Sequence, residues 1–598
     1  MKPSTPSFKF IRSFLILTVF AGLILVAFHF LSFETITNVL SRVAPDGEFA
    51  SFTQERYQIA SKLSGWLGLV FIVLAGTMLI RWPSVQNGLE KLAIWFGEFK
   101  KNLRNDADLF WDKLAFKRWD RTDLTLVSGI TLIALIMRLA SLNIPLIHDE
   151  AYTYNAFASR SLWVTISDYH LPNNHVLLTI VINILTHLFG NHLWLIRLPT
   201  IIMGVMMAPV TYVLGRRLYS RETGILSAAL VAIFPILVEY SVLARGYVPM
   251  SLGALLTLIL GDHVMKTKDR FAWLLLIVIS ALGFFTIPVM LLPFGALYVW
   301  LFLSCLAGDF NGYRSKMDFL KYWLVSGFAS AFLTVALYLP ILISNAGQFF
   351  GNQFVEPLKQ DVFYATLLAR LGLMWDDWVF LIPGWLVNLG IAGLIVGLIF
   401  HWKISKQKVP LQVAFIVWIV AFLILRRPSM MSRMWLFVVA PSLIWSAGGI
   451  VETLKVLSNA IKIKLPLARI FVGIILVSVF VLGALTIPTI PARWKQKTSV
   501  ESAVIYLKEN LREGDLVTAS VEYFPQMRYY FGVYSVPQDY LRRSAPFKRV
   551  FMVIGLRGGA TLESVVPRAG NRSEVNLDTV RIVLQFNDLT MYEGDPAP

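Results

Sequence analysis

The stretch LTLVSGITLIALIMRLASLNIPLIHDEAYTY, residues 124–154, joins a long apolar run to a polar cluster of His148, Asp149 and Glu150. An apolar run of about twenty residues predicts a helix that crosses a bilayer. Acidic side chains at a membrane boundary are costly unless they are hydrated, paired or used in function. The stretch therefore predicts a membrane-spanning helix whose far end carries either a functional site or a simple acidic helix cap.

The composition indicates that such helices make up most of the chain. Of the 598 residues, 56% are hydrophobic and only 15% are charged, and a soluble protein of this size cannot bury that much apolar surface. We interpret the net charge of +17 as lysines and arginines in cytoplasmic loops and against membrane lipids, so no nucleic acid partner is expected. The single cysteine, Cys305, excludes a disulfide framework and a cysteine-based metal site.

Thirteen apolar runs predict an all-α polytopic membrane protein. The first run follows basic residues without an evident cleavage site, which favours a retained helix over a signal peptide. The first two runs and the basic stretch 81–121, which reads as an amphipathic cytoplasmic segment, form an N-terminal extension, 1–123. The other eleven runs form a membrane core, 124–490. The predicted spans are 11–32, 62–80, 124–146, 195–215, 222–240, 247–264, 271–287, 288–307, 322–343, 379–400, 410–425, 433–450 and 468–488.

Basic loops set the predicted orientation. With 81–121 inside, the helix at 124–146 runs outward and delivers Asp149 to the outer face. The pattern holds only if the apolar stretch 175–190 does not cross, and we place it as a juxtamembrane helix because it is short for a span. The loops then expected inside are 215–221, 266–270, 313–321, 401–408 and 455–469.

The composition changes near residue 495. The stretch 499–532 reads as a helix, a Gly-Asp turn, a strand and a second helix, and 548–555 and 580–586 read as further strands. We therefore predict a small soluble α/β domain, 491–598, on the outer face.

Four polar clusters fall on the outer side under this orientation, and a longer outer loop, 344–378, adds further charges. Their gathering on one face favours a functional site over an acidic cap. The clusters are His148-Asp149-Glu150 with Tyr152 and Tyr154; Asp168, His170, Asn173, Asn174 and His175; Glu239, Tyr240, Arg245 and Tyr247; and Arg426, Arg427 and Arg433.

The chemistry of these residues leaves several roles open. In a low-dielectric cleft the pKa of a carboxyl rises, which makes Asp149 a better base toward a hydroxyl. Adjacent Asp and Glu also suit a divalent cation, with a nearby histidine as partner. Outer arginines at a membrane boundary call for an anion, either a lipid-linked phosphate or ordinary headgroups.

The stretches HDEAYTY (148–154), YHLPNNHVLLTIVINILTHLFGNHLWLIRLPTIIMG (169–204) and GRRLYSRETGILSAALVAIFPILVEYSVLARGY (215–247) carry a family resemblance. Together they resemble the integral-membrane glycosyltransferases of the C superfold, above all the protein O-mannosyltransferases and lipid A aminoarabinose transferases. The resemblance covers about 124–490, and a soluble outer C-terminal domain is common in these enzymes.

The resemblance implies a polyprenyl-phosphate-linked sugar donor, a lipid, glycan or protein acceptor, and no nucleotide cofactor. It assigns Asp149 as catalytic base and Glu150 as a residue that positions the acceptor or a metal. Two departures from the family pattern weaken the case for a metal that bridges two carboxylates. Asn174-His175 stands where relatives carry a basic residue before a Pro-Leu pair, and Arg245 follows the third core helix where some relatives carry an acidic residue. Both departures favour phosphate stabilisation by Arg245 and His175.

These considerations give one set of predicted site residues. We expect the protein in the plasma membrane (the bacterial inner membrane), with its site on the extracytoplasmic side. The catalytic residues are Asp149 and Glu150; the substrate-binding residues are His148, Tyr152, Asn174, His175, Arg245, Tyr247, Arg426, Arg427 and Arg433; the ligands of a divalent metal ion, if one is bound, are His148 and Glu150.

Two other functions fit parts of the pattern. A lipid-linked oligosaccharide ligase or polymerase also needs outer arginines, but the Asp-Glu pair after the first core helix argues against it. A secondary transporter predicts ionisable residues in mid-span and paired broken helices in a repeat, whereas the charges here lie at one boundary.

Overall fold

The computed structural model describes residues 8–41, 54–114, 119–350, 356–429, 431–460, 467–495, 498–541, 546–556, 561–565 and 575–597. The chain divides into two compact units, 1–109 and 110–598, and each is described by itself. Parts of the predicted inner loop 455–469 and of the arginine loop 426–433 lie outside the described residues.

The first unit is helical. Helices α1 (Lys9–Phe30) and α3 (Gln54–Ile80) form an antiparallel pair, with α2 (Phe33–Ser41) between them, and α4 (Trp82–Leu114) begins here. The pair packs closely at two glycines, because a Cβ on Gly22 would lie 2.8 Å from the carbonyl oxygen of Gly68. The predicted amphipathic stretch 81–121 is thus largely one long helix, α4.

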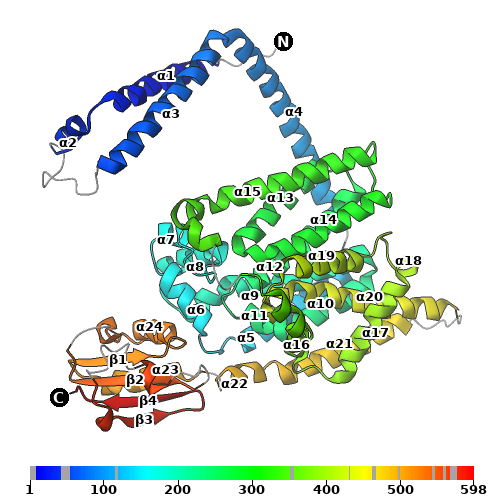
Figure 1. The fold of residues 1–598 in the computed structure, drawn as a ribbon. Helices are drawn as coiled ribbons and strands as arrows, with labels where there is room; N and C mark the ends of the chain where they lie inside the picture. The colour runs from blue at the N-terminus through cyan, green and yellow to red at the C-terminus, as the bar shows by residue number, and fades with distance from the viewer. Residues whose placement is uncertain are drawn as a thin grey trace. The chain divides into compact units, whose positions relative to one another are not determined.

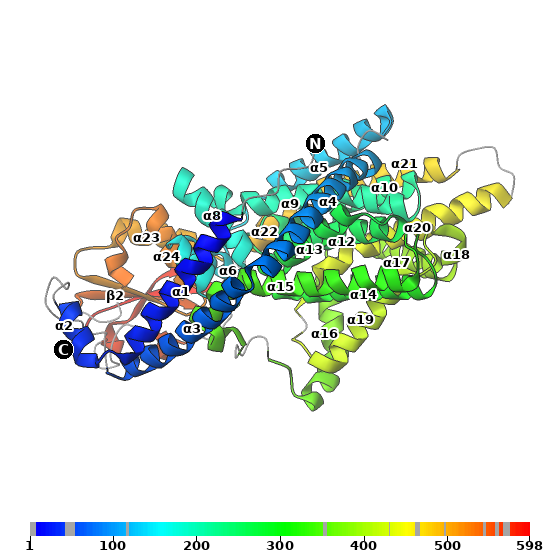
Figure 2. The same ribbon diagram turned by 90° about the horizontal axis from the view of Figure 1, so that it is seen from above.

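The second unit begins with the helical core (Figures 1 and 2). Its helices are α5 (Arg121–Ala140), α6 (His148–Thr153), η2 (Tyr154–Ala158), α7 (Leu162–Ser167), α8 (Val176–Phe189), α9 (Leu193–Leu218), α10 (Arg221–Ile233), α11 (Pro235–Ser241), α12 (Tyr247–Lys266), α13 (Arg270–Thr286), η3 (Pro288–Met290), α14 (Leu291–Leu306), α15 (Lys316–Phe350), α16 (Gln360–Val379), α17 (Gly384–Ile399), α18 (His401–Ile404), α19 (Leu411–Arg426), η5 (Ser432–Trp435), α20 (Leu436–Ala460), α21 (Leu467–Thr486) and α22 (Thr489–Lys495).

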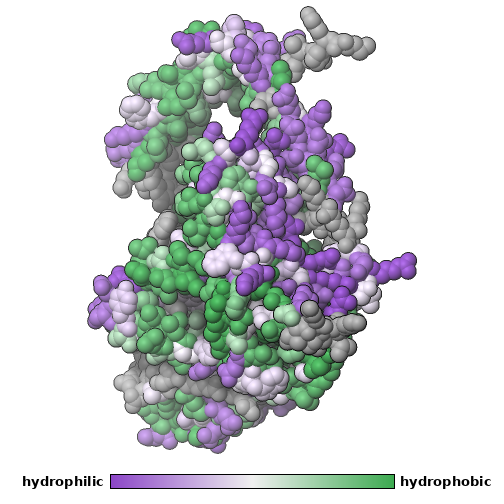
Figure 3. All heavy atoms as spheres, turned by 90° about the vertical axis from the view of Figure 1, so that its right-hand side faces the viewer, coloured by the Kyte–Doolittle hydropathy of each residue, from purple (hydrophilic) through white to green (hydrophobic). Residues whose placement is uncertain are grey.

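The described helices confirm a multi-pass membrane protein. Nine of them are long and apolar enough to cross a bilayer, or up to eleven if each of two bent helix pairs is one span. The shorter apolar helices α13 and α19 coincide with the remaining two predicted spans. Apolar side chains also cover large parts of the molecular face in Figure 3, as expected of surface that meets lipid.

The structure changes one predicted span and one predicted loop. The span 222–240 is broken between α10 and α11, which meet at 58° where Pro235 provides no N–H group. The described residues of the outer loop predicted at 344–378 are largely helical, since α15 extends into it and α16 follows; residues 351–355 lie outside the described part of the chain. Helices α16 and α17 meet at 112°, and Leu381 between them has a φ of 63°.

Helix α8 supports the juxtamembrane interpretation of 175–190. Its 14 residues extend about 21 Å, which is short of the roughly 30 Å hydrocarbon core. His175 at its start packs on Tyr247 at the start of α12, and Leu193 beyond its end packs in one cluster with Leu146 and Ala151. Both ends of α8 therefore lie with the same group of helix ends.

The predicted inner loops meet at the opposite helix ends. Asp262 of α12 accepts hydrogen bonds from Arg217 at 2.5 Å and Lys266 at 2.5 Å, and also from Gln407. Asp123 of α5 pairs with Arg216 at 2.6 Å. Carboxylates thus neutralise several of the basic residues on which the predicted orientation rests.

The C-terminal part of the second unit is a small α/β domain, as predicted. Helices α23 (Val500–Asn510) and α24 (Phe524–Val533) pack with a four-stranded sheet of order β1-β2-β4-β3 (Figure 1). Strands β1 (Asp515–Ala519) and β2 (Arg549–Gly555) are parallel, while β4 (Leu589–Gly594) pairs antiparallel with β2 and with β3 (Arg581–Gln585). The predicted Gly-Asp turn before β1 needs its glycine, since Gly514 has a φ of 94°. The sequence prediction missed β4.

Short elements complete this domain: the 3₁₀ helices η6 (Gln538–Leu541) and η9 (Leu577–Thr579), and helix α25 (Leu562–Val565). The domain contacts the helical core beside α6. The carbonyl oxygen of Pro525 accepts from Asn155 Nδ2 at 2.7 Å, and the Tyr530 hydroxyl accepts from the Leu146 N–H at 3.3 Å. The domain therefore lies against the segment that carries the predicted catalytic pair.

Candidate active site

Helix α6 separates the two neighbouring carboxylates of the sequence motif. Successive residues of a helix point about 100° apart, so adjacent side chains cannot share one face. The Glu150 side chain is turned into the protein and is completely buried, whereas the Asp149 side chain is 24% exposed. Only Asp149 of the pair lines a cavity.

Glu150 forms a buried ion pair with Arg197 of α9. Arg197 donates from Nε to Oε1 at 3.0 Å and from Nη2 to Oε2 at 2.7 Å. The same two oxygens accept the backbone N–H groups of Ala244 at 2.7 Å and Ile147 at 3.2 Å. The predicted roles of Glu150 in catalysis and metal binding need correction, because its oxygens already face four donors.

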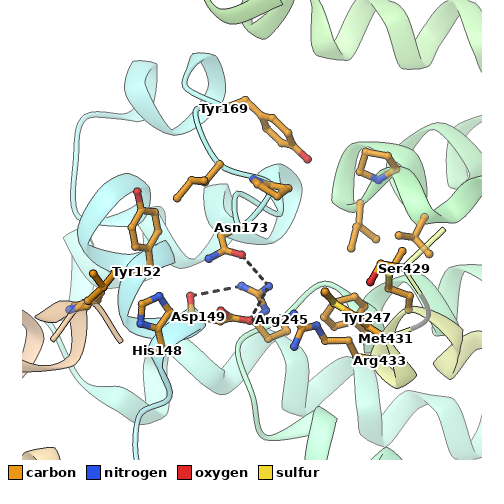
Figure 4. A pocket seen from close by; sticks show the side chains of 18 of the residues that line it. His148, Asp149, Tyr152, Tyr169, Asn173, Arg245, Tyr247, Ser429, Met431 and Arg433 are labelled. Atoms are coloured by element: carbon orange, nitrogen blue, oxygen red, sulfur yellow. Dashed lines mark hydrogen bonds and ion pairs between the residues drawn. The ribbon is translucent and has the colours of Figure 1, made fainter. Parts of the chain in front are cut away.

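Asp149 lies among cations from two segments that are distant from it in the sequence. Arg245, just before α12, places Nη2 3.3 Å from Asp149 Oδ2, and Arg433 of η5 places Nη2 3.9 Å from the same oxygen. Figure 4 shows both guanidinium groups on one side of Asp149. Three of the four predicted clusters therefore supply one site.

The remaining cluster, in the loop 168–175, reaches the same site through Asn173. Its Oδ1 accepts a hydrogen bond from Arg245 Nη2 at 3.3 Å (Figure 4). The Thr153 hydroxyl lies 2.8 Å from the carbonyl oxygen of Asp149 and 2.9 Å from that of Asn173, and Arg245 Nη1 lies 3.4 Å from the same hydroxyl. These contacts hold the arginine in place beside the carboxylate.

The environment lowers the pKa of Asp149. Burial alone would raise this pKa, but the charges of Arg245, Arg433 and His148 and a hydrogen bond from Asn173 outweigh burial. The sequence prediction of a raised pKa is therefore wrong in direction, because it considered the low dielectric without the two arginines. Asp149 is ionised at neutral pH and can accept a proton.

The cavity that Asp149 lines has a volume of about 1030 Å³. Among the described residues that line it, the charged side chains are Asp149 and three arginines, Arg245, Arg426 and Arg433. An excess of guanidinium groups over carboxylates suits an anionic ligand, and a phosphate can accept hydrogen bonds from several of them at once.

Two further walls of the cavity differ in origin. The first is apolar and comes from the ends of membrane helices; it consists of Ile287, Pro288, Val289, Leu291, Leu292, Phe422 and Met434. The second comes from the C-terminal domain and consists of Val517, Thr518, Ala519, Val521, Phe524, Pro525 and Leu541. A ligand in the cavity would thus meet both the membrane core and the soluble domain.

His148 and Tyr152 line the cavity on the other side of Asp149 from the arginines (Figure 4). They lie one helical turn apart, and their rings stack with centroids 6.2 Å apart at 25°. His148 Nδ1 is hydrogen-bonded to the carbonyl oxygen of Glu522 at 2.7 Å, so the C-terminal domain fixes this ring. Burial, and then the charge of Asp168, raises the pKa of the Tyr152 hydroxyl, which therefore stays protonated.

Three predicted substrate-binding residues do not line the cavity, and two of them, Asn174 and His175, belong to the loop 168–175. Asn174 is buried and donates from Nδ2 to the carbonyl oxygens of Thr165 at 2.9 Å and Asp168 at 2.8 Å, so it shapes the loop. His175 is buried, and its pKa is lowered well below the ordinary value, mainly by burial and then by Arg245 and Arg433. A neutral, buried imidazole does not fit the predicted role as a phosphate ligand.

The predicted arginine loop divides in a similar way. Arg426, at the end of α19, lines the cavity, as Arg433 and Tyr247 do. Arg427 does not line it; this residue has a φ of 42° and its carbonyl oxygen accepts the Leu358 N–H at 2.9 Å. The left-handed turn at Arg427 directs the chain away from α19.

The described residues do not fit the predicted metal site. His148 Nδ1 and both Glu150 oxygens are already hydrogen-bonded, and no group of three or more His, Cys, Asp or Glu side chains suited to a metal ion occurs in the described part of the chain. We therefore assign no step of the chemistry to a metal held by these two residues.

The site also contains residues absent from the predicted set. Asn173 binds Arg245, and Tyr169 lines the cavity together with Leu171 and Pro172. The motif NNH marked the correct loop, but pattern alone does not tell which of two adjacent amides faces the cavity. The wall from the C-terminal domain had no sequence signal, since it consists of ordinary apolar residues.

Comparisons with known proteins agree with this architecture. A family model described as dolichyl-phosphate-mannose-protein mannosyltransferase matches residues 176–338. Among solved structures, ArnT from Cupriavidus metallidurans bound to undecaprenyl phosphate is 12% identical with a TM-score of 0.50, and the match covers 79% of this chain and 97% of ArnT. The apo state of ArnT gives a TM-score of 0.50 at 12% identity, covering 78% of this chain and 97% of ArnT.

The archaeal oligosaccharyltransferase AglB from Archaeoglobus fulgidus, in complex with an inhibitory peptide and a dolichol-phosphate, is 13% identical with a TM-score of 0.45, covering 72% of this chain and 69% of AglB. Comparison with curated proteins gives no match. The chain has the fold of the integral-membrane glycosyltransferases of the C superfold, which confirms the resemblance found in its sequence.

Proposed function

We propose that this protein is a membrane glycosyltransferase that moves a sugar from a polyprenyl-phosphate-linked donor to an acceptor hydroxyl. The observation that carries the proposal is the cavity in which an ionised carboxylate, Asp149, lies beside Arg245 and Arg433. The family model that matches 176–338 is named for a dolichyl-phosphate-mannose donor, and ArnT was solved with undecaprenyl phosphate, so related folds handle such lipids.

The arginines are the proposed ligands of the donor phosphate. Negative charge grows on this phosphate as the sugar leaves, and preorganised guanidinium groups stabilise that charge more strongly in the transition state than in the ground state. Arg245 suits this role because its side chain is only 3% exposed and is held by Asn173 and Thr153. Arg433 and Arg426 complete the proposed phosphate site.

Asp149 is the proposed base. The acceptor oxygen attacks the anomeric carbon, the bond from that carbon to the phosphate oxygen breaks, and the hydroxyl proton passes to the Asp149 carboxylate. Polyprenyl phosphate leaves as the anion. A single displacement of this kind inverts the anomeric centre. The lowered pKa of Asp149 keeps it deprotonated and therefore able to accept the proton.

The two further walls suggest where the ends of the substrates lie. We propose that the polyprenyl chain leaves along the apolar wall at Leu291, Leu292 and Phe422, since hydrocarbon in this position reaches membrane helices. The acceptor then meets the wall from the C-terminal domain, at Thr518 and Phe524. We place the site on the extracytoplasmic face of the plasma membrane, opposite the basic helix ends.

The test uses the full chain reconstituted in lipid nanodiscs. Undecaprenyl-phosphate-linked mannose, glucose, galactose and aminoarabinose, each radiolabelled in the sugar, are incubated with lipid, glycan and peptide acceptors. We expect the wild type to release undecaprenyl phosphate from one of them with inversion at the transferred sugar. Asp149→Asn should lower kcat by at least about a hundredfold, the usual range for loss of a general base.

Binding of undecaprenyl phosphate provides the second part of the test. Arg433→Gln should weaken this binding, whereas Arg314→Gln, an exposed residue at the opposite helix ends, should not. The proposal fails if no lipid-linked sugar is consumed, or if Asp149→Asn transfers sugar as fast as the wild type.

A further inference from the structure

A chain of three hydrogen-bonded side chains leads from the surface to the cavity. Asp168 Oδ1 lies 2.7 Å from His170 Nδ1, and His170 Nε2 lies 2.8 Å from the hydroxyl oxygen of Tyr152. Tyr152 lines the cavity one helical turn from Asp149. Asp168 and His170 do not line the cavity themselves, so they can influence a ligand only through Tyr152.

The loop that carries the two outer members is well fixed. Asp168 Oδ1 also accepts the backbone N–H of His170 at 3.1 Å, and the Asp168 carbonyl oxygen accepts from Asn174 Nδ2 at 2.8 Å. The His170 ring lies against Phe157, with ring centroids 5.1 Å apart. The imidazole is therefore held on both sides while it faces the tyrosine.

The direction of each hydrogen bond follows from the tautomer of the His170 ring. An ionised carboxylate only accepts, so His170 Nδ1 carries the proton that Asp168 receives. In a neutral imidazole the other nitrogen, Nε2, is then an acceptor. The Tyr152 hydroxyl donates to such a nitrogen, and its single proton is then no longer available to a ligand. With His170 in this form, Tyr152 can only accept a hydrogen bond toward the cavity.

We infer that Asp168 and His170 are positioning residues that hold Tyr152 as a hydrogen-bond acceptor for a hydroxyl group of the transferred sugar. The inference rests on the proposed function. A sugar whose phosphate binds the arginines and whose anomeric carbon faces Asp149 extends past the carboxylate toward His148 and Tyr152, which lie on its other side (Figure 4). The stacked His148 and Tyr152 rings offer a surface for the sugar, and sugar hydroxyls are ready donors to the tyrosine oxygen.

A binding experiment without acceptor tests this inference. Dissociation constants of undecaprenyl phosphate and undecaprenyl-phospho-mannose are measured for the full chain in nanodiscs. The variants are Tyr152→Phe, His170→Ala and the two combined. We expect each single change to weaken undecaprenyl-phospho-mannose binding about threefold to tenfold, the value of one hydrogen bond, and to leave undecaprenyl phosphate binding unchanged.

The combined variant gives the sharpest comparison. If His170 acts only through the tyrosine hydroxyl, removing it from the Tyr152→Phe protein has no further effect, so the double variant should match Tyr152→Phe. Asp168→Ala should resemble His170→Ala, while Asp168→Asn, which keeps an oxygen acceptor, should restore much of the binding. The matched controls Tyr154→Phe and His187→Ala lie outside the cavity and should bind both lipids as the wild type does.

Each other outcome has a definite meaning. Additive losses in the double variant, equal losses with the sugar-free lipid, or an effect that appears only when an acceptor is added would each overturn the inference while leaving the proposed function intact. If the wild type binds none of the mannose, glucose, galactose or aminoarabinose lipids better than undecaprenyl phosphate and consumes none of them, the proposed function fails, and the inference fails with it.

Discussion

The buried pair of Glu150 and Arg197 offers the most direct test of the fold around the site. Both side chains are completely buried, and together they take part in seven hydrogen bonds. Arg197 donates to the carbonyl oxygens of Leu142, Ile144 and Pro145, at 2.6–3.1 Å. The pair thus fastens the segment from α5 to α6, which carries Asp149.

Changing Arg197 to Met should lower the free energy of unfolding by about 3–5 kcal/mol, the usual cost of leaving one buried charge without its partner. Glu150→Ala should cost at least as much, because it also leaves the N–H groups of Ile147 and Ala244 without their acceptor, at about 1–3 kcal/mol for each buried group. Typical domains have only about 5–15 kcal/mol in total, so this variant should accumulate poorly.

Unfolding in mixed detergent micelles, followed by circular dichroism, measures these changes. Arg581→Met is a matched control, since its side chain is 73% exposed and its pair with Glu593 should contribute less than about 1 kcal/mol. Many buried ion pairs can be replaced by two apolar residues without loss. Here the double variant Glu150→Met, Arg197→Met should stay destabilised, because apolar side chains cannot bind five backbone groups. Wild-type stability in that double variant would refute the reasoning.

Three further predictions concern the site itself. Arg245→Gln should move the acid limb of the pH profile of kcat/KM to higher pH, because a cation that lowers the pKa of Asp149 is lost and the carboxylate protonates at higher pH. Arg245→Lys should keep this limb near its wild-type position. An unmoved limb in the Gln variant would contradict the assignment of Asp149 as the base. Gly246→Ala should lower the free energy of unfolding by about 1–3 kcal/mol, since its Cβ would lie 2.8 Å from Nδ1 of the buried His175. Gly253→Ala, within helix α12 that follows Gly246, meets no described atom within 4 Å and should be neutral or stabilising in the same denaturation assay. Phe524→Ala should raise KM for the acceptor that the wild type glycosylates without changing undecaprenyl phosphate binding; weaker binding of the lipid would instead place the C-terminal wall on the donor side.

Much of the architecture could be predicted from apolar run length alone. Bilayer thickness sets a minimum length for every spanning helix, so apolar runs such as 124–146 and 247–264 can be recognised as spans from their length. The break in 222–240 and the bend between α16 and α17 were harder to predict, because a proline at a helix start is also common in unbroken helices. The segment 344–378 was predicted as an outer loop between two spans, and its helical structure was missed: α16 carries Asp376 and Asp377 within a helix.

The site was predictable at the level of segments and not of side chains. Each of the four polar clusters supplies at least one residue to the cavity. Asn173 lines it in place of the predicted Asn174, and of the predicted neighbours Arg426 and Arg427 only Arg426 lines it. Neighbouring residues of the same chemistry differ only in the direction of their side chains. That direction depends on loop hydrogen bonds and on a left-handed residue at 427, which composition and spacing do not reveal.

The motif Asp149-Glu150 shows why two adjacent acids need not share a function. The first faces the cavity with a lowered pKa, and the second binds Arg197 and the N–H of Ala244, the residue before Arg245. Glu150 therefore joins the segment that carries the proposed base to the segment that carries the proposed phosphate ligand. The distance of 3.3 Å between Asp149 and Arg245 depends on this buried link. A variant that weakens the link without unfolding the protein, such as Glu150→Gln, should thus lower kcat more than it weakens the binding of undecaprenyl phosphate, because alignment of base and phosphate matters most in the transition state.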